Sequence, residues 1–254
     1  MPRVLLALLI LLGSSPLDAQ QADVRDTIQR VKRSVVAVGT YQASRNPRFA
    51  FRGTGFAVGA GTLVATNAHV IPVALDKERQ EALVVAIPQA GTDVQVRSAE
   101  LLATEPDYDL AILRIAGAPL PPVRLGDSQR VREGDDCLLT GFPIGTVLGL
   151  FSATHRAMVS ALTPVALPPG NARDLDARTI RRLSAGAYSV FQLDATAYPG
   201  NSGSPLYLAS SGEVVGVINM VFVKGTKEAA LSAPSGITYA IPVQPLAALL
   251  ERLK

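Results

Sequence analysis

A serine stands between glycines in the segment Tyr198–Pro205, which reads Tyr-Pro-Gly-Asn-Ser-Gly-Ser-Pro. Glycines permit sharp backbone turns that leave amide N–H groups facing a ligand. If the N–H groups of Gly200 and Ser202 lie beside the Ser202 hydroxyl, the three groups form the arrangement of an acyl-transfer nucleophile with its oxyanion hole. The same composition also fits an ordinary turn between two strands. The segment alone leaves both interpretations open.

The chain has only two histidines, and they differ in setting. His69 follows Thr66-Asn67-Ala68, where a predicted strand ends and a turn begins, a junction at which scaffolds place functional side chains. His155 lies within a predicted strand and is interpreted as a structural residue. Two distant histidines without suitably spaced acidic partners do not supply a metal site, so no metal and no other cofactor is expected.

Asp109 directly precedes the apolar run Leu110–Ile115. A carboxylate at the mouth of a buried strand needs a partner that offsets its desolvation. A histidine N–H is such a partner, and the bond would fix the tautomer in which the other ring nitrogen acts as a base. Alternatively Asp109, like Asp107, is a turn residue that caps loop backbone. The residues alone favour neither interpretation for Asp109.

The elements that must position these residues are short strands. The 254 residues, 48% hydrophobic and 18% charged, form an ordinary globular composition that can bury a sizeable core. Helices are predicted only near the ends, at about Ala22–Lys32 and Leu246–Leu253. The many short strands and turns predict all-β barrels or sandwiches and exclude a βαβ fold. The predicted strands are Ser34–Gln42, Phe51–Val58, Thr62–Thr66, Ala82–Pro88, Val94–Ala103, Leu110–Ile115, Asp136–Gly141, Thr154–Thr163, Tyr188–Leu193, Pro205–Leu208, Val214–Val223 and Gly236–Ile241.

The first 19 residues are typical of a signal peptide. Arg3 precedes the apolar run Val4–Leu12, and Ala19 is the small residue expected before a cleavage site, although an uncleaved anchor is the alternative. The lone Cys137 is interpreted as a buried core residue, and an exported protein without disulfides fits a bacterial periplasm or secretion. No membrane association is expected after signal removal. The net charge of +3 is spread along the chain, so no nucleic-acid partner is expected either.

Three blocks of the sequence resemble, in chain order, the active-site blocks of trypsin-like serine proteases. The serine block, with an asparagine before Ser202, is similar to that of the bacterial HtrA/Deg branch. The three blocks are Thr66-Asn67-Ala68-His69-Val70, Asp109-Leu110-Ala111-Ile112-Leu113 and Gly200-Asn201-Ser202-Gly203. The similarity extends over most of the chain after the signal segment. It implies two packed antiparallel six-stranded β-barrels, at about residues 34–125 and 130–242, within one protease domain at 20–254. A nucleophile elbow, which requires the order serine, acid, histidine, is excluded by the order found here.

The resemblance also implies roles for individual residues. Ser202 would be the nucleophile, His69 the general acid and base, and Asp109 the residue that orients His69. The oxyanion hole would lie at Gly200, Asn201 and Ser202. The specificity pocket would be formed by Thr196, Ile218, Asn219, Met220 and Val221. Because Thr196 is uncharged, cleavage is expected after small or medium apolar residues of protein or peptide substrates, and not after lysine or arginine.

The chain also departs from the resembled family. It ends at Lys254 without the PDZ domain usual in HtrA proteins, so regulation by such a module is not expected and a monomer is slightly favoured over a trimer. Ser204 stands where a second glycine is usual. The segment 164–186 is a candidate lid or activation loop. An alternative function is a binding or chaperone-like protein of protease fold whose triad is idle.

Overall fold

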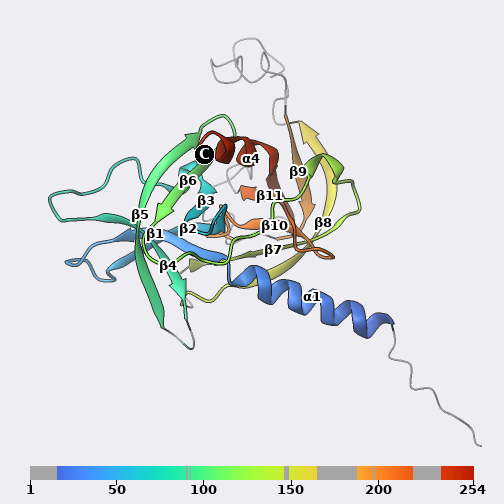
Figure 1. The fold of residues 1–254 in the computed structure, drawn as a ribbon, viewed down its shortest axis with the longest axis horizontal. Coiled ribbons are helices and arrows are strands. Elements are labelled where there is room, and N and C mark those ends of the chain that lie inside the picture. Colours follow the sequence, from blue (N-terminus) through green and yellow to red (C-terminus); the bar gives the residue numbers. More distant parts are fainter. Residues whose placement is uncertain are drawn as a thin grey trace, which may run out of the picture.

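Two closed six-stranded antiparallel barrels make up the fold in the computed structural model, and a helix adjoins them near each end of the chain (Figure 1). The structure describes residues 16–89, 91, 93–145, 149–164, 188–196, 198–219 and 236–254. The predicted segment 164–186 lies outside these residues from position 165 onward, as do residues 1–15. No helix within the described ranges is long and apolar enough to cross a membrane.

The first barrel has the strand order β1-β2-β3-β6-β5-β4. Alternate residues of these strands face a shared apolar interior, because successive side chains of a strand point to opposite faces. A 3₁₀ turn, η1 (Ala68–Val70), directly follows β3. The strands are β1 (Val35–Tyr41), β2 (Phe49–Val58), β3 (Leu63–Asn67), β4 (Ala82–Pro88), β5 (Val94–Glu105) and β6 (Leu110–Ile115).

The second barrel repeats the closed six-stranded arrangement with the order β10-β11-β12-β9-β8-β7. All twelve predicted strands are present, with ends that differ from the prediction by a few residues. The described part of β11 ends at Asn219, and residues 220–223 of the predicted strand lie outside the described residues. The strands are β7 (Asp136–Gly141), β8 (Ala153–Pro164), β9 (Ser189–Asp194), β10 (Pro205–Leu208), β11 (Val214–Asn219) and β12 (Ile237–Pro242).

Three apolar clusters fill the molecule, and the largest joins the two barrels. It combines Phe56 and Ile112 of the first barrel with Tyr207 and Ile241 of the second, all fully buried. The other two clusters fill the interiors of the second and the first barrel. Because burial of apolar side chains is the main stabilising contribution in folding, this shared cluster holds the barrels in one relative placement.

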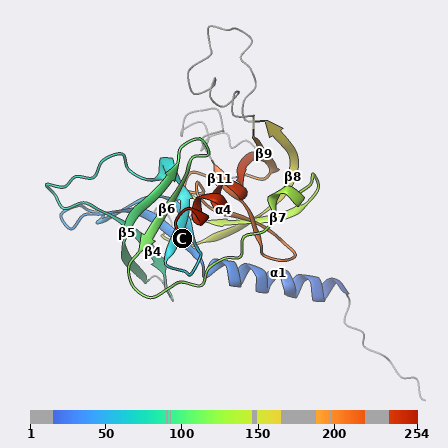
Figure 2. The same ribbon diagram turned by 45° about the horizontal axis from the view of Figure 1, so that its top comes forward.

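The two helices reinforce this junction. Helix α1 (Pro16–Lys32) contacts β7 and extends away from the barrels toward the amino-terminal end (Figures 1 and 2). It begins six residues before the predicted start at Ala22, because Pro16 fits the first turn of a helix, where no N–H donor is needed. Helix α4 (Gln244–Glu251) follows the second barrel and packs against β5 of the first.

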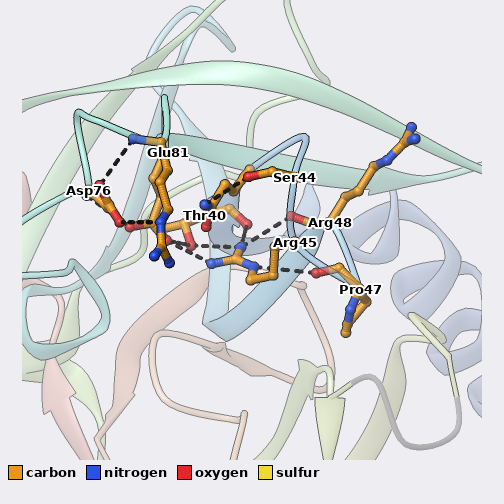
Figure 3. Close-up of polar contacts among 9 residues, drawn as sticks. Thr40, Ser44, Arg45, Pro47, Arg48, Asp76 and Glu81 are labelled. Atoms are coloured by element: carbon orange, nitrogen blue, oxygen red, sulfur yellow. Dashed lines mark hydrogen bonds and ion pairs between the residues drawn. The ribbon is translucent and has the colours of Figure 1, made fainter.

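A polar network fixes the segment that leads away from η1 (Figure 3). Arg45, in the loop between β1 and β2, donates hydrogen bonds to Glu81 Oε1 at 2.8 Å and to the Thr40 carbonyl at 2.8 Å. Glu81 Oε2 accepts the N–H of Asp76 at 3.1 Å. The Thr40 hydroxyl, the Asp76 N–H and Arg45 together lower the pKa of Glu81 to about 2. Two loops of the first barrel are thereby held together.

Candidate active site

His69 lies in the turn η1, where β3 has just ended. The turn is fixed to the Asp109 backbone, because the Asp109 carbonyl accepts the Ala68 N–H at 2.9 Å and the Asn67 side-chain amide at 3.1 Å. Val70, which follows the histidine, is buried. The His69 side chain remains about one third exposed. The sequence-based placement of His69 at a strand–turn junction is confirmed.

Asp109 holds His69 through both oxygens of its carboxylate. Oδ1 accepts the backbone N–H of His69 at 2.9 Å, and Oδ2 lies 2.6 Å from His69 Nδ1. The backbone of Asp109 has a φ of 52°, a left-handed conformation that aspartate tolerates better than most residues. Asp109 therefore does more than cap the loop: it contacts the histidine. Nδ1 is engaged by the carboxylate, which leaves Nε2 as the nitrogen able to accept a proton.

The surroundings keep Asp109 ionised. Burial alone would raise the pKa of this carboxyl, but the hydrogen bonds and charge of His69 and the Asn219 amide outweigh it, so the pKa is lowered. Asp107, two residues earlier, makes no such contact to His69; its carbonyl accepts a hydrogen bond from the Tyr188 hydroxyl at 3.3 Å. The two aspartates of this turn therefore have different surroundings.

Asn219 has a contact that sequence reasoning missed. It was predicted as part of a specificity pocket, but its side chain is fully buried at the end of β11 and its Nδ2 donates to Asp109 Oδ2 at 2.8 Å. The second barrel thus holds the aspartate of the first. No local signal could have revealed this contact, because 110 residues separate the two partners.

Ser202 lies at the junction of two consecutive β-turns. The Asn201 N–H donates to the Tyr198 carbonyl at 2.9 Å, and the Ser204 N–H donates to the Asn201 carbonyl at 3.0 Å. Each turn has a glycine with positive φ at its third position, Gly200 at 105° and Gly203 at 85°. These are the positions at which a turn of this kind requires glycine. The Pro-Gly and Ser-Gly pairs of the sequence therefore specify the local shape.

Both glycines are also needed because the backbone is crowded there. A side chain on Gly200 would collide with the Phe142 carbonyl oxygen and lie 2.8 Å from Cε1 of Phe51. A side chain on Gly203 would collide with the Thr54 carbonyl oxygen and the Thr66 hydroxyl. The segment Tyr198–Ser204, called the Ser202 segment below, is therefore packed tightly against strands of the first barrel.

Thr54 of β2 joins the first barrel to the Ser202 segment. Its N–H donates to the Ser202 carbonyl at 2.9 Å, and its hydroxyl donates to the Gly200 carbonyl at 2.7 Å. The same hydroxyl accepts the Phe142 N–H at 3.1 Å. Thr54 is fully buried, so these bonds are shielded from water.

A further bond orients the peptide between Pro199 and Gly200. Its carbonyl accepts the Ile144 N–H at 2.7 Å. Since C=O and N–H point in opposite directions in a trans peptide, the Gly200 N–H faces away from Ile144. Across the parts of the chain that the structure describes, neither the Gly200 N–H nor the Ser202 N–H donates to a protein acceptor. Ile144 itself has a φ of 59°, which is unusual for a β-branched residue.

The serine block and the histidine block meet at Gly53. A side chain placed there would lie 2.7 Å from Val70 Cγ2 and 3.0 Å from the Ser202 carbonyl oxygen. Among the described residues, Ser202 Oγ forms no hydrogen bond with His69. In unliganded enzymes such a bond is often long and shortens only when substrate is bound. The structure thus pairs His69 with Asp109 and brings the Ser202 segment against the histidine turn.

The predicted pocket residues differ in burial, and two of them fall outside the described residues. Ile218 is fully buried in the core of the second barrel, and its backbone N–H and carbonyl bond the Ser204 carbonyl and the Gly203 N–H, both at 2.9 Å. Thr196 is partly exposed. Met220 and Val221 lie outside the described residues.

The paired barrels, with His69, Asp109 and Ser202 carried by loops where they meet, define the trypsin-like class. Residues 53–217 match the model of the trypsin-like peptidase domain, and the chain belongs to this family. It is also similar to HtrA-type proteases, through both curated relatives and solved structures.

Two curated relatives and one solved structure illustrate the similarity. A probable periplasmic serine endoprotease DegP-like of Pseudomonas putida is 29% identical over 203 residues, which are 80% of this chain and 34% of that protein. Serine protease HTRA2, mitochondrial, of Bos taurus is 31% identical over 247 residues, 95% of this chain and 46% of that protein. The HtrA-type protease AlgW with tripeptide superposes with a TM-score of 0.61 at 27% identity, over 90% of this chain and 61% of that one. The chain therefore spans about a third to a half of these curated relatives' length.

Proposed function

We propose that this chain is a serine endopeptidase that cleaves protein or peptide substrates through His69, Asp109 and Ser202. The observation that carries the proposal is the bond between Asp109 Oδ2 and His69 Nδ1 at 2.6 Å, in a chain whose serine segment packs against the same turn. A carboxylate on Nδ1 leaves Nε2 as the base, which is the role this reaction requires.

The reaction follows from the placement of these groups. Ser202 Oγ attacks the scissile carbonyl while His69 Nε2 takes the hydroxyl proton, which the imidazolium then gives to the leaving amine. Asp109 stabilises the imidazolium. The N–H groups of Gly200 and Ser202 bind the oxyanion of the tetrahedral intermediate, each worth about 2.7–4 kcal/mol in this kind of site. Water, activated by the same histidine, then hydrolyses the acyl-enzyme and restores Ser202.

Turnover of casein by the purified protein and its Ser202→Ala variant tests this function. The substitution removes one oxygen and should lower kcat by at least about 10⁴-fold without changing the thermal unfolding profile. Ser189→Ala, which alters an exposed serine at the start of β9, serves as the matched control and should retain activity. Activity of Ser202→Ala close to that of the wild type would refute the assignment. A wild-type protein that binds casein without cleaving it would favour the binding alternative.

The substrate preference is proposed to be small or medium apolar residues before the scissile bond. Thr196, at the position that the resemblance assigns to the base of the specificity pocket, carries no charge that could pair with lysine or arginine. Profiling with a peptide library tests this directly. A profile dominated by arginine or lysine at that position would refute it.

Export to the periplasm is proposed from the signal-like residues 1–19 and from the relatives described as periplasmic. Amino-terminal sequencing of protein recovered from a periplasmic fraction should give Gln20 as the first residue. A chain that begins at Met1 in that fraction would contradict cleavage after Ala19.

A further inference from the structure

Unpartnered polar atoms gather beneath the Ser202 segment. Within the described part of the chain, five buried side-chain nitrogen or oxygen atoms have no hydrogen-bond partner. Three of them belong to two residues beside Ser202: both carboxamide atoms of Asn201 and the hydroxyl of Ser204. Both residues are 0% exposed. Such a concentration next to a proposed nucleophile calls for a physical explanation.

Two of these atoms, Ser204 Oγ and Asn201 Oδ1, lie close to Gly141, the last residue of β7. A side chain on Gly141 would collide with Ser204 Oγ and would lie 2.8 Å from Asn201 Oδ1 and 3.0 Å from Thr54 Oγ1. Because Gly141 has no side chain, the three oxygens of Ser204, Asn201 and Thr54 can lie close to its backbone. We call the group formed by Thr54, Gly141, Asn201 and Ser204 the polar seat.

The polar seat is directly connected to the donors proposed for the oxyanion. The backbone of Asn201 closes both turns around Ser202, through its N–H on one side and its carbonyl on the other. The Thr54 hydroxyl, which already donates to the Gly200 carbonyl, can still accept one hydrogen bond. Any group bound in the seat would therefore restrain the peptides on both sides of Ser202.

A single small molecule with both donor and acceptor capacity meets the needs of the seat. Ser204 offers a hydroxyl that can donate or accept, and the Asn201 carboxamide offers one acceptor and two donors. Leaving them unpaired costs the full desolvation of each group, whereas a buried water typically forms about three hydrogen bonds in such a site. Water, which can both donate and accept hydrogen bonds, is the ligand that fits this chemistry.

We propose that Asn201 and Ser204 bind one internal water molecule in the polar seat, and that Ser204 is thereby a positioning residue for the oxyanion donors. The catalytic consequence rests on the proposed serine endopeptidase function, whereas the water site does not. Ser204, which stands where the serine block of the similar proteases usually has a glycine, thus has a function: its hydroxyl completes the water site.

The direction of the stability change in Ser204→Ala tests the water site. If a water bridges Ser204 and Asn201, losing the hydroxyl removes a hydrogen bond and should lower Tm by about 2–4 °C. If the hydroxyl is truly unpaired, its removal relieves a desolvation cost and Tm should rise, which would overturn the proposal. A crystal structure should show ordered water within hydrogen-bond distance of Ser204 Oγ and Asn201. A direct bond between those two side chains with no water would also overturn it.

Turnover tests the positioning role. Ser204→Ala should lower kcat by about tenfold with KM nearly unchanged, less than the 10²–10³-fold expected for loss of an oxyanion donor itself. Ser128→Ala is the matched control: this buried serine accepts the Val243 N–H at 3.1 Å, away from the site. It should lower Tm without affecting kcat. Equal kcat losses in both variants would refute the positioning role. If the wild type shows no turnover, the proposed function and the positioning role both fail, and Tm and the crystal structure still decide the water site.

Discussion

The two barrels contribute to the site in different ways. The first barrel supplies His69 and Asp109 from neighbouring strand ends, and two bonds join them directly. The second supplies Ser202 from two successive turns whose glycines have positive φ and close backbone neighbours that crowd any added side chain. Each contribution is nevertheless completed by the opposite barrel, since Asn219 bonds Asp109 and Thr54 bonds the Ser202 segment.

This contrast indicates which substitutions should affect turnover most. The His69–Asp109 pair is held by short charged contacts, so a single lost neighbour leaves its main bonds in place. The Ser202 segment depends on backbone shape, which several residues of both barrels maintain together. Substitutions near the turns should therefore change turnover more than comparable substitutions elsewhere, as the following predictions specify.

Gly200→Ala should have the largest effect. The new methyl group would collide with the Phe142 carbonyl oxygen while the backbone has a φ of 105°. Displacing the Gly200 N–H should lower kcat by about 10²–10³-fold, the range for loss of one oxyanion donor. Gly134→Ala is the matched control, because Gly134 has a φ of 92° but no atom within 4 Å of the added carbon. Casein turnover and thermal unfolding of both variants give the comparison. Turnover of Gly200→Ala as high as that of Gly134→Ala would contradict the role of the Gly200 N–H as an oxyanion donor.

Thr54→Val should have an intermediate effect. Valine preserves the shape of the side chain but removes the hydroxyl that bonds the Gly200 carbonyl and the Phe142 N–H. The His69–Asp109 pair should be unaffected, because neither residue contacts this hydroxyl. We expect kcat to fall by about tenfold with little change in KM, the loss expected when oriented groups shift slightly. Steady-state kinetics check this. An unchanged kcat would mean that the Thr54 hydroxyl does not restrain the backbone of the Ser202 segment.

His155→Phe should make stability less dependent on pH. Burial lowers the pKa of His155, so the unfolded chain binds a proton more readily than the folded one as pH falls below about 6.5. The preferential protonation of the unfolded chain has no effect above neutral pH, and in mild acid it progressively lowers the free energy of unfolding. Tm measured from pH 7 to pH 5 should fall less steeply in the variant than in the wild type. Parallel curves would show that His155 does not titrate differently on folding.

Much of the fold follows from local patterns in the sequence. Short apolar runs such as the one that opens Val35–Tyr41, together with glycine-marked turns, predict the twelve strands, because burial and turn chemistry act over short distances. The predicted start of α1 at Ala22 was wrong. The helix begins at Pro16, within the residues that the sequence analysis assigned to a signal peptide.

The site was predictable to a similar extent. The desolvation argument led from Asp109 to a histidine partner, and the contact with His69 is present. The contacts of Asn219 and Thr54 could not be predicted, because each joins residues far apart in the chain and depends on how the barrels pack. Long-range packing leaves no periodic signal in a single sequence.

Mapping the serine that reacts with a fluorophosphonate probe tests the central claim most directly. Such probes phosphonylate a serine that a base and an oxyanion hole activate, with loss of fluoride. The label should therefore be found on the tryptic peptide that contains Ser202 and should disappear in Asp109→Asn, whose histidine loses its orienting carboxylate. Labelling of a different serine, or equal labelling of the wild type and Asp109→Asn, would contradict the account.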